Sequence, residues 1–234
     1  MTGLSKWSKN GHIYFIHSED WESSDIRISL TPNQGSYSYI GTDNALIAKG
    51  RETLNLGWLW EDMDNGLYGT ISHEGGHAIG LGHEHRRVKL KRDVVIDRFS
   101  GPPNNWTISQ IEQNILNPFD EEQMDLSESI DYVSVMMYML DKSLTVDGIG
   151  SGYNEELSLG DHDFIGKIYP KPHTPEPVDT EKVVDFITAL IQRRTQLSGF
   201  DGNQLELICL RLSLRADGLK WQKRNRIRRH LNLR

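Results

Sequence analysis

The sequence has few of the features that mark secreted scaffold or membrane proteins. Its 234 residues include one cysteine, Cys209, so no internal disulfide can form and the fold must rest on a packed core, with or without a metal. The longest apolar stretch, Ile130 to Leu140, is interrupted by Asp131 and is much shorter than a membrane span. The N-terminus has no basic segment followed by an apolar run, so no signal peptide is recognisable in the sequence. These absences exclude a multi-pass membrane protein and favour a cytoplasmic location, while secretion stays open if the N-terminus is incomplete.

The charge is unevenly spread, which indicates more than one unit. The chain is 37% hydrophobic and its net charge is −7, but residues 179–234 carry +6 and the rest carries −13. Three prolines between Lys171 and Pro177 are typical of a stiff linker. We therefore predict a domain over residues 1–170, a proline-rich linker over 171–178 and a small module over 179–234.

The first domain is predicted to be α+β. Short β-branched or aromatic runs predict strands in its first third, and helices are expected to follow. The strands are expected at Ile13–Ile16, Ile26–Leu30, Tyr37–Ile40 and Thr53–Leu56. The helices are expected from Leu67 to about Ile79, after a capping box at Thr107 and Gln110, and after a cap at Ser158 and Asp161.

One predicted helix carries the residues with clear chemistry. Residues 73–83 read His-Glu-Gly-Gly-His-Ala-Ile-Gly-Leu-Gly-His. His73 and His77 are four positions apart, so on a helix they differ by about 40° and share a face. Two imidazoles placed in this way bind one Zn²⁺, and Glu74 beside them is suited to hold a metal-bound water.

The third ligand requires the helix to end. If the helix continued, His83 would lie about 15 Å along the axis from His73 and beyond the same ion. Gly80 can adopt the positive φ that ends a helix and reverses the chain, which would return His83 to the metal. Three histidines leave one tetrahedral position open, as in catalytic zinc sites. We expect His85 at the surface, because a fourth ligand would close that position.

The glycines within this helix support the catalytic interpretation. Gly75 and Gly76 each cost a helix interior about 1 kcal/mol relative to alanine. A purely structural helix gains nothing from them, whereas a close approach of backbone or substrate explains their presence. The five fixed positions of the motif arise by chance in roughly one chain in ten thousand.

The residues from His73 to His83 resemble the signature of metzincin zinc peptidases. The segment Asp131–Tyr138 is similar to the Met-turn of that clan, which implies that Met136 forms an apolar floor beneath the zinc. Without the histidines, ordinary core packing would be the better explanation of Met136 and Met137. Tyr138 resembles the tyrosine that astacins place near the metal, and Glu84 matches the astacin pattern after the third histidine.

The likeness covers roughly residues 10–170 and points to a microbial astacin- or matrixin-like branch. It implies a metzincin-like fold with a twisted mixed sheet, an active-site helix and a Met-turn. The chain departs from the family in three ways. Leu4–Trp7 is similar to the end of a long helix that family members place earlier, no disulfides are available, and no inhibitory propeptide is recognisable.

The resemblance implies a zinc-dependent endopeptidase with one catalytic Zn²⁺ and a protein or peptide substrate. Glu74 would act as general base and acid, and the Tyr138 hydroxyl would stabilise the oxyanion. In similar families an edge strand before the active-site helix pairs with substrate. Glu52–Trp58 is the candidate here, with Leu54, Asn55 and Leu56 as substrate-binding residues. An ordinary edge strand explains this segment equally well.

The C-terminal module is predicted to be helical. Apolar residues recur at helical spacing in three segments, and Cys209 falls on an apolar face. The segments contain Val183–Ile191, Leu205–Leu212 and Trp221–Leu231. The module loosely resembles helical adaptor modules, which implies a protein partner through residues 179–234. Its basic end, Lys220–Arg229, is better explained as a solvated face than as a nucleic-acid site.

Two alternatives to the peptidase stay open from the sequence. One is a degenerate domain that binds zinc or peptide without cleaving it. The other is a nucleic-acid binder with a vestigial catalytic domain, which the basic tail would favour. Because Glu74 and all three histidines of the motif are present, the sequence favours the enzyme.

Overall fold

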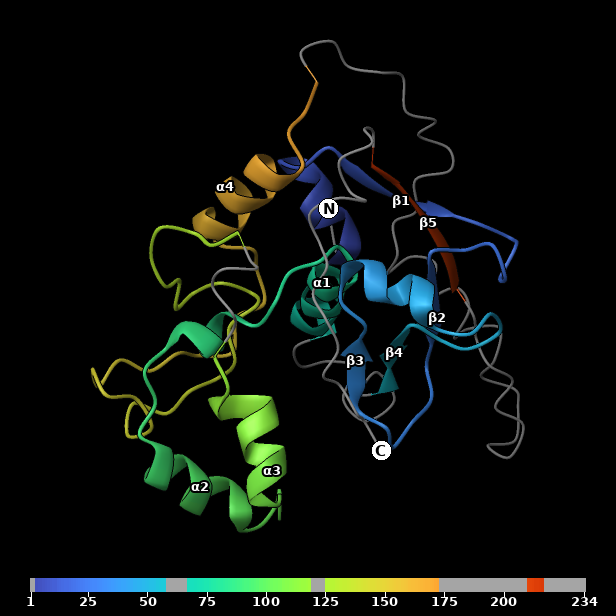
Figure 1. The fold of residues 1–234 in the computed structure, drawn as a ribbon. Coiled ribbons are helices and arrows are strands. Elements are labelled where there is room, and N and C mark those ends of the chain that lie inside the picture. Colours follow the sequence, from blue (N-terminus) through green and yellow to red (C-terminus); the bar gives the residue numbers. More distant parts are fainter. Residues whose placement is uncertain (1–2, 58–66, 119–124, 173–209, 217–234) are drawn as a thin grey trace.

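The computed structural model describes residues 3–57, 67–118, 125–172 and 210–216. Four short strands precede the α-helices and a fifth follows them, and together they confirm the predicted α+β class (Figure 1). The strands are β1 (Ile13–His17), β2 (Ile26–Ser29), β3 (Ser36–Ser38), β4 (Leu54–Leu56) and β5 (Leu210–Ala216). The helices are α1 (Leu67–Ala78), α2 (Arg92–Ser100), α3 (Ile108–Ile111) and α4 (Leu159–Ile168), with a 3-10 helix η1 (Gly3–Lys9) at the start.

The five described strands form one mixed sheet in the order β1-β5-β2-β4-β3. The pair β2 and β4 is parallel, and the other three pairs are antiparallel. The predicted positions of the first four strands and of α1 are confirmed. Both capping boxes also form, at the starts of α3 and α4. The sequence did not predict α2, whose first-turn and last-turn residues are mostly polar.

The strand β5 corrects the prediction of a helix over Leu205–Leu212. Figure 1 shows it between β1 and β2, and the pairs Phe15 with Leu214 and Ile28 with Leu210 fix its register. The helical prediction used the spacing of Leu205, Ile208, Cys209 and Leu212. The leucines of this strand alternate from Leu210 to Leu214 at a strand period, and the two patterns overlap, so local sequence cannot decide between them. The other residues of the predicted C-terminal module, Cys209 and Lys220–Arg229 included, lie outside the described part of the chain.

The strand β4 corrects the prediction of an edge strand. It pairs with β2 on one side and with β3 on the other, so its backbone is already occupied. Its residues Leu54, Asn55 and Leu56 are all buried, as expected for a strand covered on both faces. Among the described strands, β3 is the one at this end of the sheet.

Two apolar clusters meet at the turn that contains Met136 and Met137. The first joins η1, the sheet, α1 and α4, and Met136 belongs to it. The second lies around α2 and α3, and Met137 belongs to it. Figure 1 shows α1 between the sheet and the half of the molecule that carries α2 and α3. The helix with the predicted metal ligands therefore lies at the junction of the two halves.

None of the helices within the described ranges is long and apolar enough to cross a membrane.

Candidate metal centre

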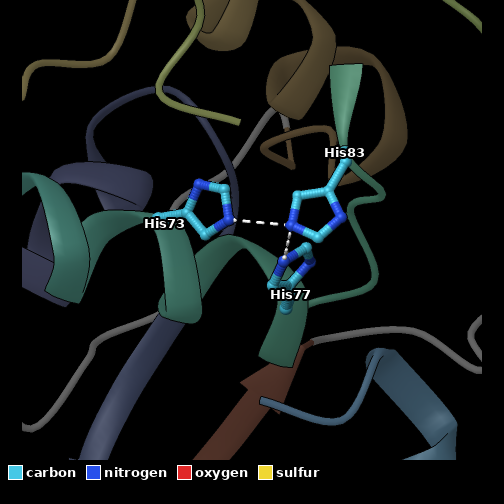
Figure 2. A group of neighbouring side chains, drawn as sticks. All are labelled: His73, His77 and His83. Atoms are coloured by element: carbon cyan, nitrogen blue, oxygen red, sulfur yellow. Dashed lines mark hydrogen bonds between the residues drawn. The ribbon is translucent and has the colours of Figure 1, made fainter. Parts of the chain in front are cut away.

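The three predicted histidines converge. In Figure 2 the rings of His73 and His77 project from α1 toward His83, which comes from the segment after the helix. The Nε2 atom of His83 lies 3.1 Å from that of His73 and 2.9 Å from that of His77. Three nitrogens around one zinc at 2.0–2.1 Å in a tetrahedron would be separated by about 3.3 Å. The three rings are thus already spaced to share one ion.

The chain reversal at Gly80 returns His83 to the helix, as predicted. Gly80 has a φ of +103°. Its N–H donates to the His77 carbonyl at 2.9 Å, and the Leu81 N–H donates to the Gly76 carbonyl at 2.9 Å. These two bonds form a Schellman motif, which satisfies the last carbonyls of α1 while the chain turns back.

Backbone carbonyls orient two of the three rings. The Nδ1–H of His73 donates to the Val135 carbonyl, and that of His77 donates to the Leu81 carbonyl, both at 2.8 Å. A carbonyl oxygen only accepts, so Nδ1 carries the ring proton and Nε2 keeps its lone pair for a metal. The turn that returns His83 therefore also sets the tautomer of His77.

The electrostatic environment keeps the rings neutral. Burial lowers the pKa of His73, lowers that of His77 to about 3, and places that of His83 well below its ordinary value. The neighbouring histidines lower the pKa values of His77 and His83 further, because like charges would repel. Neutral imidazoles are the form that binds a metal. Among the described residues, these three form the one group of His, Cys, Asp and Glu side chains close enough to hold an ion together.

Glu74 follows His73 on α1 and is a buried carboxyl group. Its side chain is 5% exposed, and its Oε2 has no hydrogen-bond partner among the described residues. Burial raises its pKa to about 8. Its charge raises the pKa of Tyr138, which places the two groups within electrostatic reach of each other. A buried carboxyl oxygen without a partner beside three neutral imidazoles fits a site whose ligands come from outside the chain.

Tyr138 packs against the same rings. Its ring centroid lies 4.3 Å from that of His83 and 6.1 Å from that of His73. Burial raises its pKa to about 12, and Glu74 adds to the shift. The phenol therefore keeps its proton near neutral pH and can donate a hydrogen bond.

The segment around Met136 lies beneath α1. An added Cβ at Gly76 would lie 2.4 Å from the Met136 sulfur, so the predicted close approach at this glycine is a contact with the methionine. At Gly75 the corresponding neighbour is the Leu4 side chain, at 2.3 Å. The Glu84 N–H donates to the Met136 carbonyl at 3.0 Å, which ties the turn to the residue after His83.

A buried carboxylate that the sequence analysis treated only as a helix cap supports this turn. Asp161 at the start of α4 accepts hydrogen bonds from the Ser134 hydroxyl at 2.6 Å and the Val135 N–H at 2.9 Å. The carbonyl of Val135 is the acceptor for His73. Asp161 thus fixes the peptide segment that orients a predicted metal ligand, His73. The capping pattern located this residue, but nothing in the sequence indicated its second set of partners.

The predicted surface position of His85 is wrong. The residue is fully buried, and its ring stacks on Tyr138 with the centroids 4.2 Å apart and the planes 19° apart. It is not part of the metal-ligand group, as predicted. The prediction rested on keeping one zinc position open, which argues against a fourth ligand but does not determine whether the ring is packed.

The predicted substrate-binding residues of β4 have other roles. Leu54 and Leu56 belong to the apolar core. The Asn55 amide accepts hydrogen bonds from the Ser29 hydroxyl and the Thr31 N–H, and it donates to the carbonyls of Thr31 and Gly35. Its side-chain oxygen and nitrogen are both hydrogen-bonded within the protein. Asn55 therefore stabilises the loops at the end of the sheet and is not available to bind a substrate.

The chain is similar to proteins of known family. The model of the Astacin peptidase family matches residues 1–149. The structure of myroilysin is 32% identical and superposes with a TM-score of 0.67 over 72% of this chain and 84% of that chain. Bone morphogenetic protein 1 of Xenopus laevis is 30% identical over 183 residues, and Tolloid-like protein 2 of Homo sapiens is 30% identical over 135 residues.

The curated relatives are much longer than this chain. The matched regions cover 72% and 58% of this chain but 24% and 12% of the Xenopus and human relatives. The family model covers more than half of the chain and includes the three histidines, Glu74 and the turn with Met136. The chain therefore belongs to the astacin family of zinc metalloendopeptidases.

Proposed function

We propose that the chain hydrolyses peptide bonds in extended protein or peptide substrates, with one zinc ion held by His73, His77 and His83. The observation that supports this most directly is the convergence of three Nε2 atoms beside the buried carboxyl group of Glu74. Two of the rings have their Nδ1 atoms fixed by carbonyls, and all three are kept neutral by burial. This donor set fits zinc and leaves a fourth position for water or substrate.

Zinc, when bound, polarises a substrate carbonyl and lowers the pKa of water. Glu74 would take the proton from the attacking water and later deliver it to the leaving amine. Its pKa of about 8 in the metal-free site reflects burial. A carboxyl oxygen without a hydrogen bond of its own is free to hold a proton and release it again during one turnover.

Tyr138 would donate a hydrogen bond to the oxygen that gains negative charge during attack. Its pKa of about 12 keeps the hydroxyl protonated at working pH. A donor of this kind acts strongly in a site that excludes water, and losing one such donor costs about 10²–10³ in kcat.

The strand β3 is the candidate for pairing with the substrate backbone, in place of β4. It pairs only with β4 among the described strands, and it packs against α1. An extended peptide that adds to such an edge gains main-chain hydrogen bonds. The substrate would then lie alongside the helix that carries His73 and His77.

The substitution Glu74→Gln tests the proposal. It keeps the shape of the side chain but removes the proton acceptor, so we expect full zinc content and loss of nearly all peptide cleavage. Zinc is measured by atomic absorption and cleavage with denatured casein, with and without a chelator. Cleavage by the variant at the wild-type rate would refute the role of Glu74. Zinc binding by the wild-type protein without any cleavage would favour a degenerate binding domain instead.

A further inference from the structure

We propose that His85 is a positioning residue for Tyr138, and that its ring holds the phenol at the metal centre. This inference rests on the proposed function, because it concerns how the tyrosine is kept in place for the reaction. The strongest evidence is the nearly parallel stack of the two rings, with centroids 4.2 Å apart and planes 19° apart.

Tyr138 packs against the rings of His83 and His85, whose own centroids lie 5.2 Å apart. The ring of His83, a predicted metal ligand, lies 4.3 Å away at an angle of 60°, and the ring of His85 covers the phenol in parallel. The next residue in the chain, Met139, is 71% exposed, so the backbone at this point reaches the surface. A phenol carried by such a segment needs a partner ring to restrict its rotation, and His85 supplies it.

The ring of His85 is itself fixed. It is fully buried, and its Nε2–H donates to the Asn114 carbonyl at 3.2 Å. The following residue, Arg86, donates from Nη2 to the Gln113 carbonyl at 2.8 Å. Two consecutive residues are thus tied to two consecutive carbonyls of the helical turn Glu112–Leu116. The His85 ring, which stacks on Tyr138, is therefore anchored in the half of the molecule that carries α2 and α3.

Two of the three predicted metal ligands are oriented by bonds that do not involve His85, while the ring of the third, His83, lies 5.2 Å from the ring of His85. His73 and His77 are oriented by the carbonyls of Val135 and Leu81, and neither bond involves His85. A residue that only filled the core would affect stability and metal binding together with activity. A positioning residue should instead affect the step that needs the Tyr138 hydroxyl and leave zinc in place.

Four variants separate these roles: His85→Ala, His85→Phe, Tyr138→Phe and the double variant His85→Ala/Tyr138→Phe. We expect His85→Ala to lower kcat about tenfold or more with KM and zinc content unchanged, since a displaced oxyanion donor acts on the transition state. His85→Phe keeps a flat ring and should recover most of kcat. The double variant should be no slower than Tyr138→Phe, because the histidine would act through the tyrosine.

The control is His12→Ala. His12 is also buried and packs edge-on to a tyrosine, Tyr14, with centroids 5.6 Å apart, but it lies near the start of β1 rather than at the metal centre. We expect a lower melting temperature for this variant with kcat unchanged. Equal losses of kcat in His12→Ala and His85→Ala would mean that general destabilisation explains both, and would overturn the proposal.

A readout without turnover separates this proposal from the proposed function. In full-length protein labelled with 3-fluorotyrosine, the ¹⁹F resonance missing from Tyr138→Phe identifies this ring. We expect the resonance to shift or broaden in His85→Ala and to stay near its wild-type position in His85→Phe, in zinc-free as in zinc-loaded protein. An unchanged resonance in His85→Ala, or losses of kcat that multiply in the double variant, would overturn the role of His85. A wild-type protein without peptidase activity would overturn the proposed function but would leave the ¹⁹F test decisive for the ring stack.

Discussion

The metal centre is formed by residues that lie close together in the sequence, whereas the sheet depends on segments that lie far apart in it. At the metal centre, helical spacing and one glycine within eleven residues bring three imidazoles together, and the structure contains that arrangement. In the sheet, the neighbour of β1 and β2 comes from the other end of the sequence, at Leu210–Ala216. Local spacing therefore determines the chemistry, whereas contacts between distant segments determine the frame that holds it.

The largest expected effect concerns the metal centre. His83→Ala removes one of three metal ligands, and we expect zinc affinity to fall by at least about 100-fold with loss of peptide cleavage. Zinc competition with a chromogenic chelator measures the affinity. The matched control is His162→Ala on α4, a histidine outside the ligand group, which should keep wild-type affinity. Unchanged zinc stoichiometry and affinity in His83→Ala would contradict the three-histidine site.

The next largest effect concerns the sheet and its strand β5. A chain that ends at residue 172 lacks β5 and leaves β1 and β2 without the strand that joins them. We expect its melting temperature to fall by about 10 °C or more, since 1 kcal/mol corresponds to about 2–4 °C in a chain of this size. Thermal unfolding by circular dichroism measures it. A chain that ends at Ala216 keeps β5 and is the control. Equal stability of the chain ending at 172 and the full chain would show that β5 is dispensable.

The contrast between the metal centre and the sheet shows which features could be predicted from the sequence. Helix periodicity, the capping residues Ser158 and Thr107, and the reversal at Gly80 are local devices, and each is present in the structure. The assignment of β4 to an edge and of Leu212 to a helix depended on which strands are neighbours. Neither a three-residue buried run nor alternating leucines carries that information. The stacking of His85 on Tyr138 joins residues 53 positions apart and was hidden for the same reason.

A moderate effect is expected where the two apolar clusters meet. Gly76→Ala places a Cβ 2.4 Å from the Met136 sulfur, and the resulting overpacking costs about 1–3 kcal/mol. This cost exceeds the gain of about 1 kcal/mol from better helix propensity. We therefore expect a lower melting temperature. Gly166→Ala in α4 is the matched control, because its Cβ would meet only the Asn10 carbonyl at 3.7 Å, and it should stabilise the protein. A gain in stability from both substitutions would contradict the packing at Met136.

The smallest effect is a pH dependence at Glu74 in the metal-free protein. Its pKa is raised from 4.5 to about 8 in the folded state, so between these values the unfolded chain releases a proton that the folded chain retains. The carboxyl group therefore destabilises the fold increasingly as pH rises from 4.5 to 8. We expect Glu74→Gln to raise the melting temperature at pH 8 and to leave it unchanged at pH 4. The same difference at both pH values would exclude a raised pKa.

The coordination of the bound metal tests the central claim most directly. X-ray absorption at the zinc edge of the zinc-loaded protein reports ligand type, number and distance. We expect one zinc per chain with three imidazole nitrogens at about 2.0–2.1 Å and one further oxygen from outside the protein, unchanged in Glu74→Gln. A site with four protein ligands, or a protein that binds no zinc at stoichiometric concentration, would contradict it.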